Sequence, residues 1–319
     1  MANNSQNNLK FSIVVPIYND GYLADALCKE IDIVFKDYLA TNDLSPILEL
    51  IFVNDGSKND SLITLLNLSK SYNFLKIIDL SRNFGQHSAI ACGFKESNGE
   101  IVVRMNVDMQ DPPAVLPKLI RILENEDCDL VVGQYEQRNS PLTNKVTSYM
   151  FFQLFRFMTG LDVPHNTSPM RVMNRKFINA YNLLTEKSRF PQGLDIWLGY
   201  KHKYVSISHQ KRVDDKSSYS FAARLSLAVV GILYFSDRPI KFVAYLGFLT
   251  ALLGIILGIY IIFGKLLGND YLPGFATLAS LGLIAFGLQV GSLGLVGLYI
   301  GKIFTEVQNR PIYLIRKIY

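Results

Sequence analysis

The chain has 319 residues, a formal net charge of +5 and a mean hydropathy of +0.19, which is high for a soluble protein. Apolar residues are concentrated in the last quarter, whereas the first two thirds have the composition of an ordinary globular domain. Three widely spaced cysteines, Cys28, Cys92 and Cys128, argue against a disulfide framework or a Cys/His metal cluster and indicate reduced thiols. Residues 1–10 are polar and lack an apolar signal core, so we expect the first domain to remain cytosolic.

The first hundred residues alternate between short apolar runs and segments with helical spacing. The pattern predicts strands at residues 11–17, 48–53, 75–80 and 100–103, and helices at residues 23–38, 60–71 and 86–97. Repeated strand–turn–helix units are typical of an α/β fold with a mainly parallel sheet and flanking helices.

The next hundred residues are less regular. We expect helices at 116–126, 145–159, the second half of 170–184 and 194–200, strands at 130–133 and 204–208, and no regular element at 161–169. The aromatic segment 145–159 is either a core helix or a helix at a membrane surface. Residues 221–235 read as an amphipathic helix that is too short to span a membrane and suits its interface.

Polar residues follow three of the predicted parallel strands. They are Asn19 and Asp20, then Asp55 with Ser57, then Asp108, Gln110 and Asp111. Because ligands bind at the carboxyl ends of parallel strands, we expect these residues to line one crevice. Carboxylate and amide oxygens suit a hard divalent cation, and such an ion suits a diphosphate.

The acidic segment at residues 106–113 has a second interpretation. Asp111 could be the N-cap of the following helix, with Pro112 in its first turn. The convergence of strand ends favours the metal site, because a helix cap needs no such partners. The sheet also lacks a GxGxxG fingerprint and a P-loop, which disfavours a nicotinamide enzyme or a P-loop NTPase.

Two apolar runs at residues 240–263 and 274–300 are long enough to cross a bilayer as a hairpin. Glycines in the second run either permit close helix contact or are simply tolerated there. Basic residues precede and follow the hairpin, whereas its connecting loop has one lysine, so the positive-inside rule places both ends in the cytoplasm. The expected domains are a catalytic domain at 1–212, a linker and interfacial helix at 213–238, the hairpin at 239–302 and a tail at 303–319. Within that tail, residues 311–316 could return to the globular domain as a strand.

Several motifs occur in a fixed order: PIYND at 16–20, VNDGS at 53–57, SRNFG at 81–85, DMQDPP at 108–113 and EVQNRP at 306–311. Together with Arg189, Phe190 and the apolar hairpin, they resemble glycosyltransferase family 2, and within it the polyprenyl-phosphate glycosyltransferases related to dolichol-phosphate mannosyltransferase. The resemblance covers nearly the whole chain.

This resemblance implies a GT-A fold and inverting transfer of a sugar from a nucleotide-diphosphate sugar to a lipid phosphate, with Mg²⁺ or Mn²⁺. The implied metal ligands are Asp108 and Gln110. The implied nucleotide-sugar residues are Pro16, Tyr18, Asp20, Asp55, Ser57, Asn83 and Asn106. The implied acceptor-phosphate residues are Arg138, Asn166, Ser168, Arg189, Lys211 and Arg212, and the implied catalytic residues are Asp108, Arg138 and Asp162. The arginines and the lysine could equally be solvated or contact lipid headgroups.

Two positions depart from the family pattern. Relatives often have Asp where this chain has Asn106, and many bacterial relatives have an acidic residue where it has Asn166. Since Asn cannot act as a base, either Asp162 or His165 replaces it or no base is needed, and we favour the last because a lipid phosphate is already nucleophilic.

The favoured reaction is transfer of glucose from UDP-glucose to undecaprenyl phosphate at the bacterial inner membrane, by a multi-pass protein with cytoplasmic termini. A processive transferase is disfavoured because the QxxRW signature is absent. A catalytically impaired scaffold is the alternative from another class, and its support is Asn106 and Asn166. We expect no nucleic-acid partner, and homo-oligomerisation is left open.

Overall fold

The computed structural model describes residues 10–45, 47–135, 153, 155–162, 164, 166–187, 191–207, 236–267 and 274–319. By their contacts these residues belong to two units. The first draws on Met1–Phe152, Leu161–Tyr219 and Pro311–Tyr319, and the second on Gln153–Gly160 and Ser220–Arg310.

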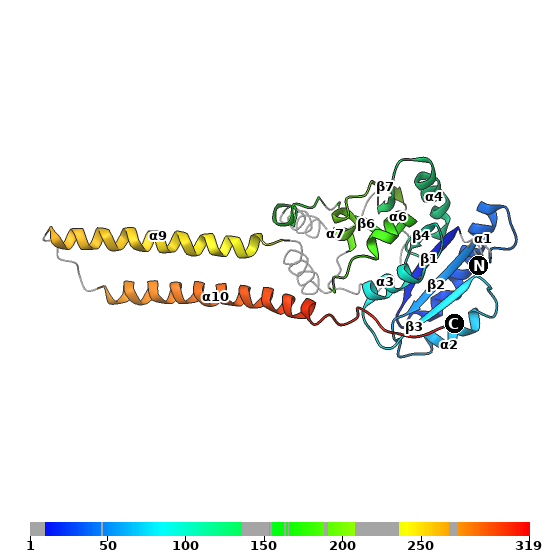
Figure 1. The fold of residues 1–319 in the computed structure, drawn as a ribbon, viewed down its shortest axis with the longest axis horizontal. Helices are drawn as coiled ribbons and strands as arrows, with labels where there is room; N and C mark the ends of the chain where they lie inside the picture. The colour runs from blue at the N-terminus through cyan, green and yellow to red at the C-terminus, as the bar shows by residue number, and fades with distance from the viewer. Residues whose placement is uncertain are drawn as a thin grey trace, which may run out of the picture. The chain divides into compact units, whose positions relative to one another are not determined.

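The first unit is built on an eight-stranded sheet in the order β7-β5-β6-β4-β1-β2-β3-β8 (Figure 1). Its strands are β1 (Phe11–Ile17), β2 (Leu48–Asn54), β3 (Leu75–Leu80), β4 (Ile101–Arg104), β5 (Leu130–Tyr135), β6 (Thr167–Asn174), β7 (His202–Ile207) and β8 (Ile315–Ile318). Strands β4, β1, β2 and β3 are mutually parallel, as the sequence predicts, and β5 pairs in parallel with β7. The sheet is mixed because β6 and β8 run antiparallel to their neighbours.

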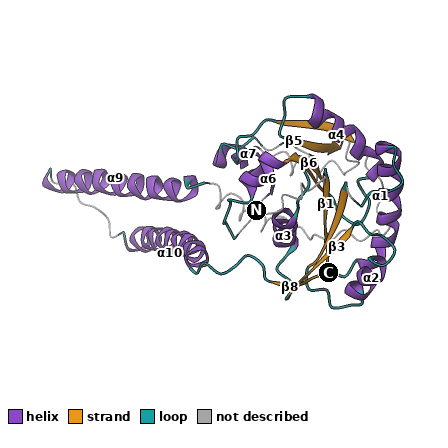
Figure 2. Cartoon of the chain, turned by 45° about the vertical axis from the view of Figure 1, so that its right-hand side comes forward, coloured by secondary structure: helices purple, strands orange, loops and turns teal. Residues whose placement is uncertain are grey.

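Helices cover both faces of the sheet (Figure 2). They are η1 (Gly21–Leu23), α1 (Ala24–Leu39), α2 (Ser61–Leu68), α3 (Gln86–Glu96), η2 (Pro113–Val115), α4 (Leu116–Asn125), α6 (Arg175–Tyr181) and α7 (Pro191–Trp197). Alternate strand residues such as Ile13 and Val15 pack with α1 and α4 in the main core. Val14 faces the other way, against α3, where a side chain at Gly93 would collide with it. Burial on both faces explains why these strands are almost continuously apolar.

Strand β6 corrects one expectation. Residues 161–169 were predicted to have no regular structure, yet β6 begins at Thr167 and lies between β4 and β5. The helix expected in the second half of 170–184 is present as α6, and its N-cap Asn174 accepts a 2.8 Å hydrogen bond from Phe177 N. A strand was missed because Ser168 and Arg171 are polar residues on a buried strand, where pattern rules expect apolar ones.

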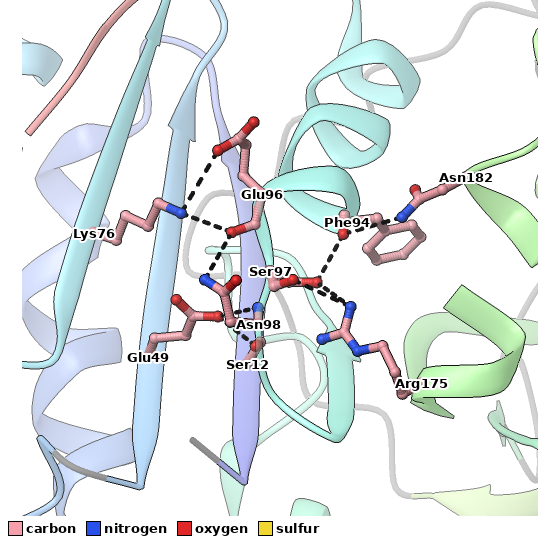
Figure 3. A network of polar contacts seen from close by, with 9 residues as sticks. All are labelled: Ser12, Glu49, Lys76, Phe94, Glu96, Ser97, Asn98, Arg175 and Asn182. Atoms are coloured by element: carbon pink, nitrogen blue, oxygen red, sulfur yellow. Dashed lines mark hydrogen bonds and ion pairs between the residues drawn. The ribbon is translucent and has the colours of Figure 1, made fainter. Parts of the chain in front are cut away.

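Polar side chains also join the amino-terminal ends of β1 and β2 (Figure 3). Glu49 Oε1 accepts 2.6 Å hydrogen bonds from Ser12 Oγ and from Asn98 N. Arg175 donates to the carbonyl of Ser97 at 3.1 Å. This network fixes the turn before β4, and it lies at the edge of the sheet opposite the carboxyl ends of β1, β2 and β4.

The second unit contains two long helices, α9 (Arg238–Leu266) and α10 (Phe275–Val307). By length and composition alone, both are candidates to cross a membrane. The qualifying windows are Arg238–Ile256, with mean hydropathy 1.9, and Ile284–Val307, with mean hydropathy 1.6. Tyr299 of α10 donates a 2.8 Å hydrogen bond to the carbonyl of Ser236, just before α9. The predicted amphipathic helix at 221–235 lies outside the described residues.

Candidate active site

The loops that follow β1 and β2 are joined by hydrogen bonds. Asn19 N donates to Ser57 Oγ at 2.9 Å, and Lys58 N donates to Asn19 Oδ1 at 2.9 Å. Asn19 has φ of +62°, a left-handed conformation that asparagine tolerates better than most residues. The structure therefore brings the predicted residues Asp20 and Ser57 into adjacent loops at one sheet edge, near Pro16 and the exposed ring of Tyr18.

Asp55 connects this edge to the loop after β3. Its carboxylate accepts hydrogen bonds from Phe84 N at 2.7 Å and Gly85 N at 2.9 Å. Burial raises the pKa of Asp55, and the two backbone N–H groups oppose that shift. The neighbouring Gly56 has φ of +61°, and a side chain there would collide with the backbone of Arg82. The loop containing Asn83 is thus held directly over the end of β2.

Asn106 joins the end of β4 to the same region. Its Oδ1 accepts a 3.0 Å hydrogen bond from Gln86 Nε2 at the start of α3. An amide carries no charge but still supplies the acceptor that this contact requires. Asn106 therefore lies at the same strand edge as the nucleotide residues expected from the sequence.

The proposed metal ligands occupy a tight turn after β4. Gln110 N donates to Asp108 Oδ1 at 3.3 Å, and Met109 between them has φ of +50°, a costly conformation for a residue that is not glycine. The turn presents one carboxylate and one amide from half-buried residues. Among the described residues no three His, Cys, Asp or Glu side chains form a metal cluster. Two hard oxygen donors fit Mg²⁺ or Mn²⁺ that shares its remaining positions with water and a diphosphate.

Asp111 has a different role from the predicted helix cap. The helical turn after it has Pro112 at its N-cap and no side-chain cap hydrogen bond. Asp111 is 4% exposed, and its Oδ2 accepts a 2.5 Å hydrogen bond from Ser168 Oγ in β6. The cap interpretation is therefore wrong, and Asp111 instead fastens the Asp108–Gln110 turn to the neighbouring strands.

The same contact revises the role of Ser168. Its side chain is 1% exposed, and its Oγ also accepts from Met170 N at 2.8 Å. Such a buried and engaged hydroxyl positions Asp111 and is not placed to bind an acceptor phosphate. The side chain of Tyr135, which the sequence analysis did not identify, hydrogen-bonds to Asp111 and Ser168. Burial is the main cause that raises the pKa of Tyr135, and the charge of Asp111 raises it further.

A cavity of about 730 Å³ lies beside this cluster, at the end of β5, before the start of β6 and along β7. It is lined by Gln134, Tyr135, Asp162, Pro164, Asn166, Ile196, His202, Tyr204 and Ser206. Tyr135 N donates to the carbonyl of Asn166 at 2.9 Å, so the cavity adjoins the cluster. Burial, followed by the charge of Asp195, raises the pKa of Tyr204 to about 12. Two of the predicted site residues, Asp162 and Asn166, therefore line the same polar cavity.

Four predicted cations, Arg138, Arg189, Lys211 and Arg212, lie outside the described residues. Tyr135 and the Asp111–Ser168 pair were missed because they are recognised through contacts between residues distant in sequence. The local signal for Tyr135 was its place two residues after the predicted strand at 130–133, which in the structure extends to Tyr135.

A sequence profile described as glycosyl transferase family 2 matches residues 12–181. An uncharacterized glycosyltransferase of Synechocystis is 33% identical over 96% of this chain and 95% of its own. A prophage-derived bactoprenol glucosyl transferase of Shigella flexneri is 29% identical over 97% of this chain and 98% of its own.

Among solved structures, glucosyl-3-phosphoglycerate synthase from Mycobacterium tuberculosis, in complex with Mn²⁺, UDP and phosphoglyceric acid, resembles this fold. Its TM-score is 0.50 at 18% identity, over 70% of this chain and 76% of that one. The mixed sheet with flanking helices, the ordered motifs and the full-length relatives lead to one assignment. The chain belongs to glycosyl transferase family 2 and is a glycosyltransferase with a GT-A fold.

Proposed function

We propose that this protein transfers glucose from UDP-glucose to undecaprenyl phosphate, with inversion, at the cytoplasmic face of the bacterial inner membrane. The observation that carries the proposal is that hydrogen bonds of Asp55 and Asn106 join the loops after β2, β3 and β4, next to the Asp108–Gln110 turn and a polar cavity. The bactoprenol glucosyl transferase of Shigella flexneri, similar over almost its full length, supports the lipid acceptor and the sugar.

The donor would lie across the ends of β1, β2 and β4. Pro16, Tyr18, Asp20, Asp55, Ser57, Asn83 and Asn106 would hold the nucleotide and the ribose. Asp108 and Gln110 would hold Mg²⁺ or Mn²⁺, which would neutralise charge on the diphosphate. The complex of the M. tuberculosis synthase with Mn²⁺ and UDP describes such a combination in a protein of similar fold.

The acceptor would enter from the side of the cavity. An oxygen of the lipid phosphate attacks the anomeric carbon of the sugar, and the bond from that carbon to the diphosphate oxygen breaks, so UDP departs with the electron pair. The phosphate is already ionised and needs no proton removed, so Asn166 and Asp162 would serve by orienting the acceptor. The cations Arg138, Arg189, Lys211 and Arg212 remain proposed phosphate contacts. Catalysis then rests on alignment and on stabilising the departing charge.

We further propose that α9 and α10 form the membrane hairpin, with the catalytic domain at 1–212, the interfacial segment at 213–238 and the tail at 303–319. The two candidate spans support a hairpin between residues 239 and 302. Basic residues before and after the hairpin favour cytoplasmic termini. This arrangement would hold the active site at the headgroup plane, where a lipid phosphate lies.

The test is UDP release by the purified full chain, with undecaprenyl phosphate, Mg²⁺ or Mn²⁺ and a panel of UDP-sugars. We expect lipid-dependent release with UDP-glucose. Asp108→Ala should abolish it, whereas Asp127→Ala, an exposed carboxylate before β5, should behave as the wild type. Release with another sugar alone would overturn the glucose assignment. No release with any sugar would favour the scaffold.

A further inference from the structure

The last residues of the chain complete the sheet of the first unit. Strand β8 pairs antiparallel with β3, which would otherwise be the edge strand (Figure 2). Ser81 N donates to the carbonyl of Leu314 at 2.9 Å, and Tyr319 N donates to that of Ile77 at 2.9 Å. Backbone pairing of this kind protects an exposed edge and requires no particular side chain.

One side chain of β8 does more than cover an edge. Arg316 Nη1 lies 3.0 Å from Asp79 Oδ2, and Arg316 Nη2 donates to the carbonyl of Ser81 at 2.7 Å. Asp79 is 1% exposed, so its charge needs a cation and hydrogen bonds within the protein. The guanidinium therefore bridges the end of β3 and the first residue of the following loop.

Both ends of this bridge lead to the nucleotide loops. The other oxygen of Asp79 accepts a 2.7 Å hydrogen bond from Asn54 Nδ2, at the end of β2. Asn54 Oδ1 in turn accepts from Ser57 N at 3.4 Å, and Ser57 Oγ accepts from Asn19 N. Ser81, at the other end, begins the loop whose N–H groups at Phe84 and Gly85 hold Asp55.

We propose that Arg316, in the C-terminal strand, is a positioning residue of the nucleotide-sugar site that sets the Asn54–Ser57 and Ser81–Gly85 loops through Asp79 and Ser81. This inference rests on the proposed function, since it assigns those loops to the nucleotide. It explains why the chain, after its second candidate span, returns to the sheet beside β3. Without Arg316, both loops would lose this support.

Strand β8 offers a matched control. Lys317 carries the same charge as Arg316 and is its neighbour. Its ammonium lies 4.4 Å from the centroid of the Tyr319 ring, whereas the ion pair with Asp79 is made by Arg316. Replacing Lys317 tests the strand and its charge, and replacing Arg316 tests the bridge.

The experiment compares full-length Arg316→Gln, Arg316→Lys and Lys317→Gln proteins in UDP binding by calorimetry and in steady-state turnover. We expect Arg316→Gln to raise both the Kd for UDP and the KM for the nucleotide sugar roughly tenfold, since coupled polar networks commonly show effects of this size. The KM for undecaprenyl phosphate and kcat should change much less. Arg316→Lys should recover part of the affinity, and Lys317→Gln should match the wild type.

A second variant covers loss of folding. Arg316→Gln leaves the buried Asp79 charge unpaired, and adding Asp79→Asn removes that charge while the bridge stays broken. The double variant should fold and still bind UDP weakly. Wild-type UDP affinity in folded Arg316→Gln or in the double variant would overturn the inference. A wild-type protein that binds no nucleotide would instead overturn the proposed function, so the two failures are distinguishable.

Discussion

The hydroxyl of Ser168 donates a 2.5 Å hydrogen bond to Oδ2 of Asp111, although the two residues are 57 positions apart. Both are buried, and Asp111 follows directly on the proposed metal ligand Gln110. The contact fastens the Asp108–Gln110 turn to β6, an antiparallel strand that lies between β4 and β5. The position of this turn therefore depends on Ser168 and Asp111, neither of which is a proposed ligand of the metal or of the nucleotide sugar.

Replacing Ser168 with alanine should loosen this turn. The change removes a hydrogen bond to a buried carboxylate, which costs about 1–3 kcal/mol. We expect a lower melting temperature of the full chain and a higher requirement for divalent metal in UDP release. Ser45→Ala, which removes an exposed hydrogen bond to Asp43, is the control and should change neither. An unchanged metal requirement in Ser168→Ala would contradict the positioning role.

If Asp108 and Gln110 bind the metal, variants of these residues should respond differently from the wild type to EDTA and added Mn²⁺. EDTA should stop UDP release by the wild type, and added Mn²⁺ should restore it, since Asp108 and Gln110 supply hard oxygen ligands. In Asp108→Ala, added Mn²⁺ should restore little activity, whereas Gln110→Glu keeps an oxygen ligand and should recover more at high Mn²⁺. Activity that persists in EDTA would rule out the metal-dependent account.

Two buried arginines are neighbours on the face of the sheet opposite the main core. Arg104 and Arg171 are paired across β4 and β6, and Arg171 Nε donates to Asp195 Oδ2 at 2.6 Å. Nε of Arg104 is buried without a hydrogen-bond partner among the described residues, and burial lowers the pKa of Arg104 to about 10. Asp195 is the ion-pair partner of Arg171, and its charge, together with that of Asp111, also opposes the lowering of the Arg104 pKa.

We expect two substitutions in this group to change the free energy of unfolding by different amounts. Asp195→Asn should destabilise the protein by about 3–5 kcal/mol, because it leaves buried positive charge uncompensated. Arg104→Met should be nearly neutral or stabilising, since an apolar side chain removes a desolvated charge. Thermal unfolding of the two full-length variants measures the difference. Equal losses of stability in the two variants would show that Arg104 has a stabilising partner of its own.

Thiol reactivity tests the first unit independently of catalysis. Burial raises the pKa of the Cys28 and Cys92 thiols to about 12 and also raises the pKa of the half-buried Cys128. In native protein at pH 8, iodoacetamide should alkylate Cys128 first, and its rate should rise with pH as the thiolate fraction grows. Peptide mass spectrometry locates the label.

The raised pKa values of the buried thiols also predict how the stability of the protein depends on pH. A thiol that ionises at higher pH in the folded state than in the unfolded state holds more protons when folded. The free energy of unfolding should therefore fall as the pH rises above the ordinary thiol value of 9.0. Rapid labelling of Cys28 in native protein would show that α1 does not pack on the sheet as described.

The sequence predicted the parts of this fold that local patterns determine. Buried parallel strands such as β2 are largely apolar, and each ends in a polar turn, so their parallel arrangement and the convergence of Asp20 and Asp55 could be inferred. The return of the C-terminal segment as a strand is also confirmed, although β8 begins at Ile315, later than the predicted 311.

What the sequence could not predict depends on contacts between distant residues. Strand β6 contains Ser168 and Arg171, whose burial is possible only because Asp111 and Asp195 lie opposite them. Asp111 has the local features of a helix cap, yet its hydrogen bond to Ser168 determines its position. Local rules do not contain such partners, and the same is true of Tyr135 and of Arg316.

The central claim, sugar transfer to a lipid phosphate, is tested most directly by the mass of the lipid product. Full-length protein in vesicles containing undecaprenyl phosphate would be incubated with UDP-glucose and Mn²⁺, and the extracted lipid analysed by mass spectrometry. We expect undecaprenyl phosphate carrying one hexose on its phosphate, formed by the wild type and by Asp127→Ala but not by Asp108→Ala. UDP release without a glycosylated lipid, or the same lipid product from Asp108→Ala, would contradict it.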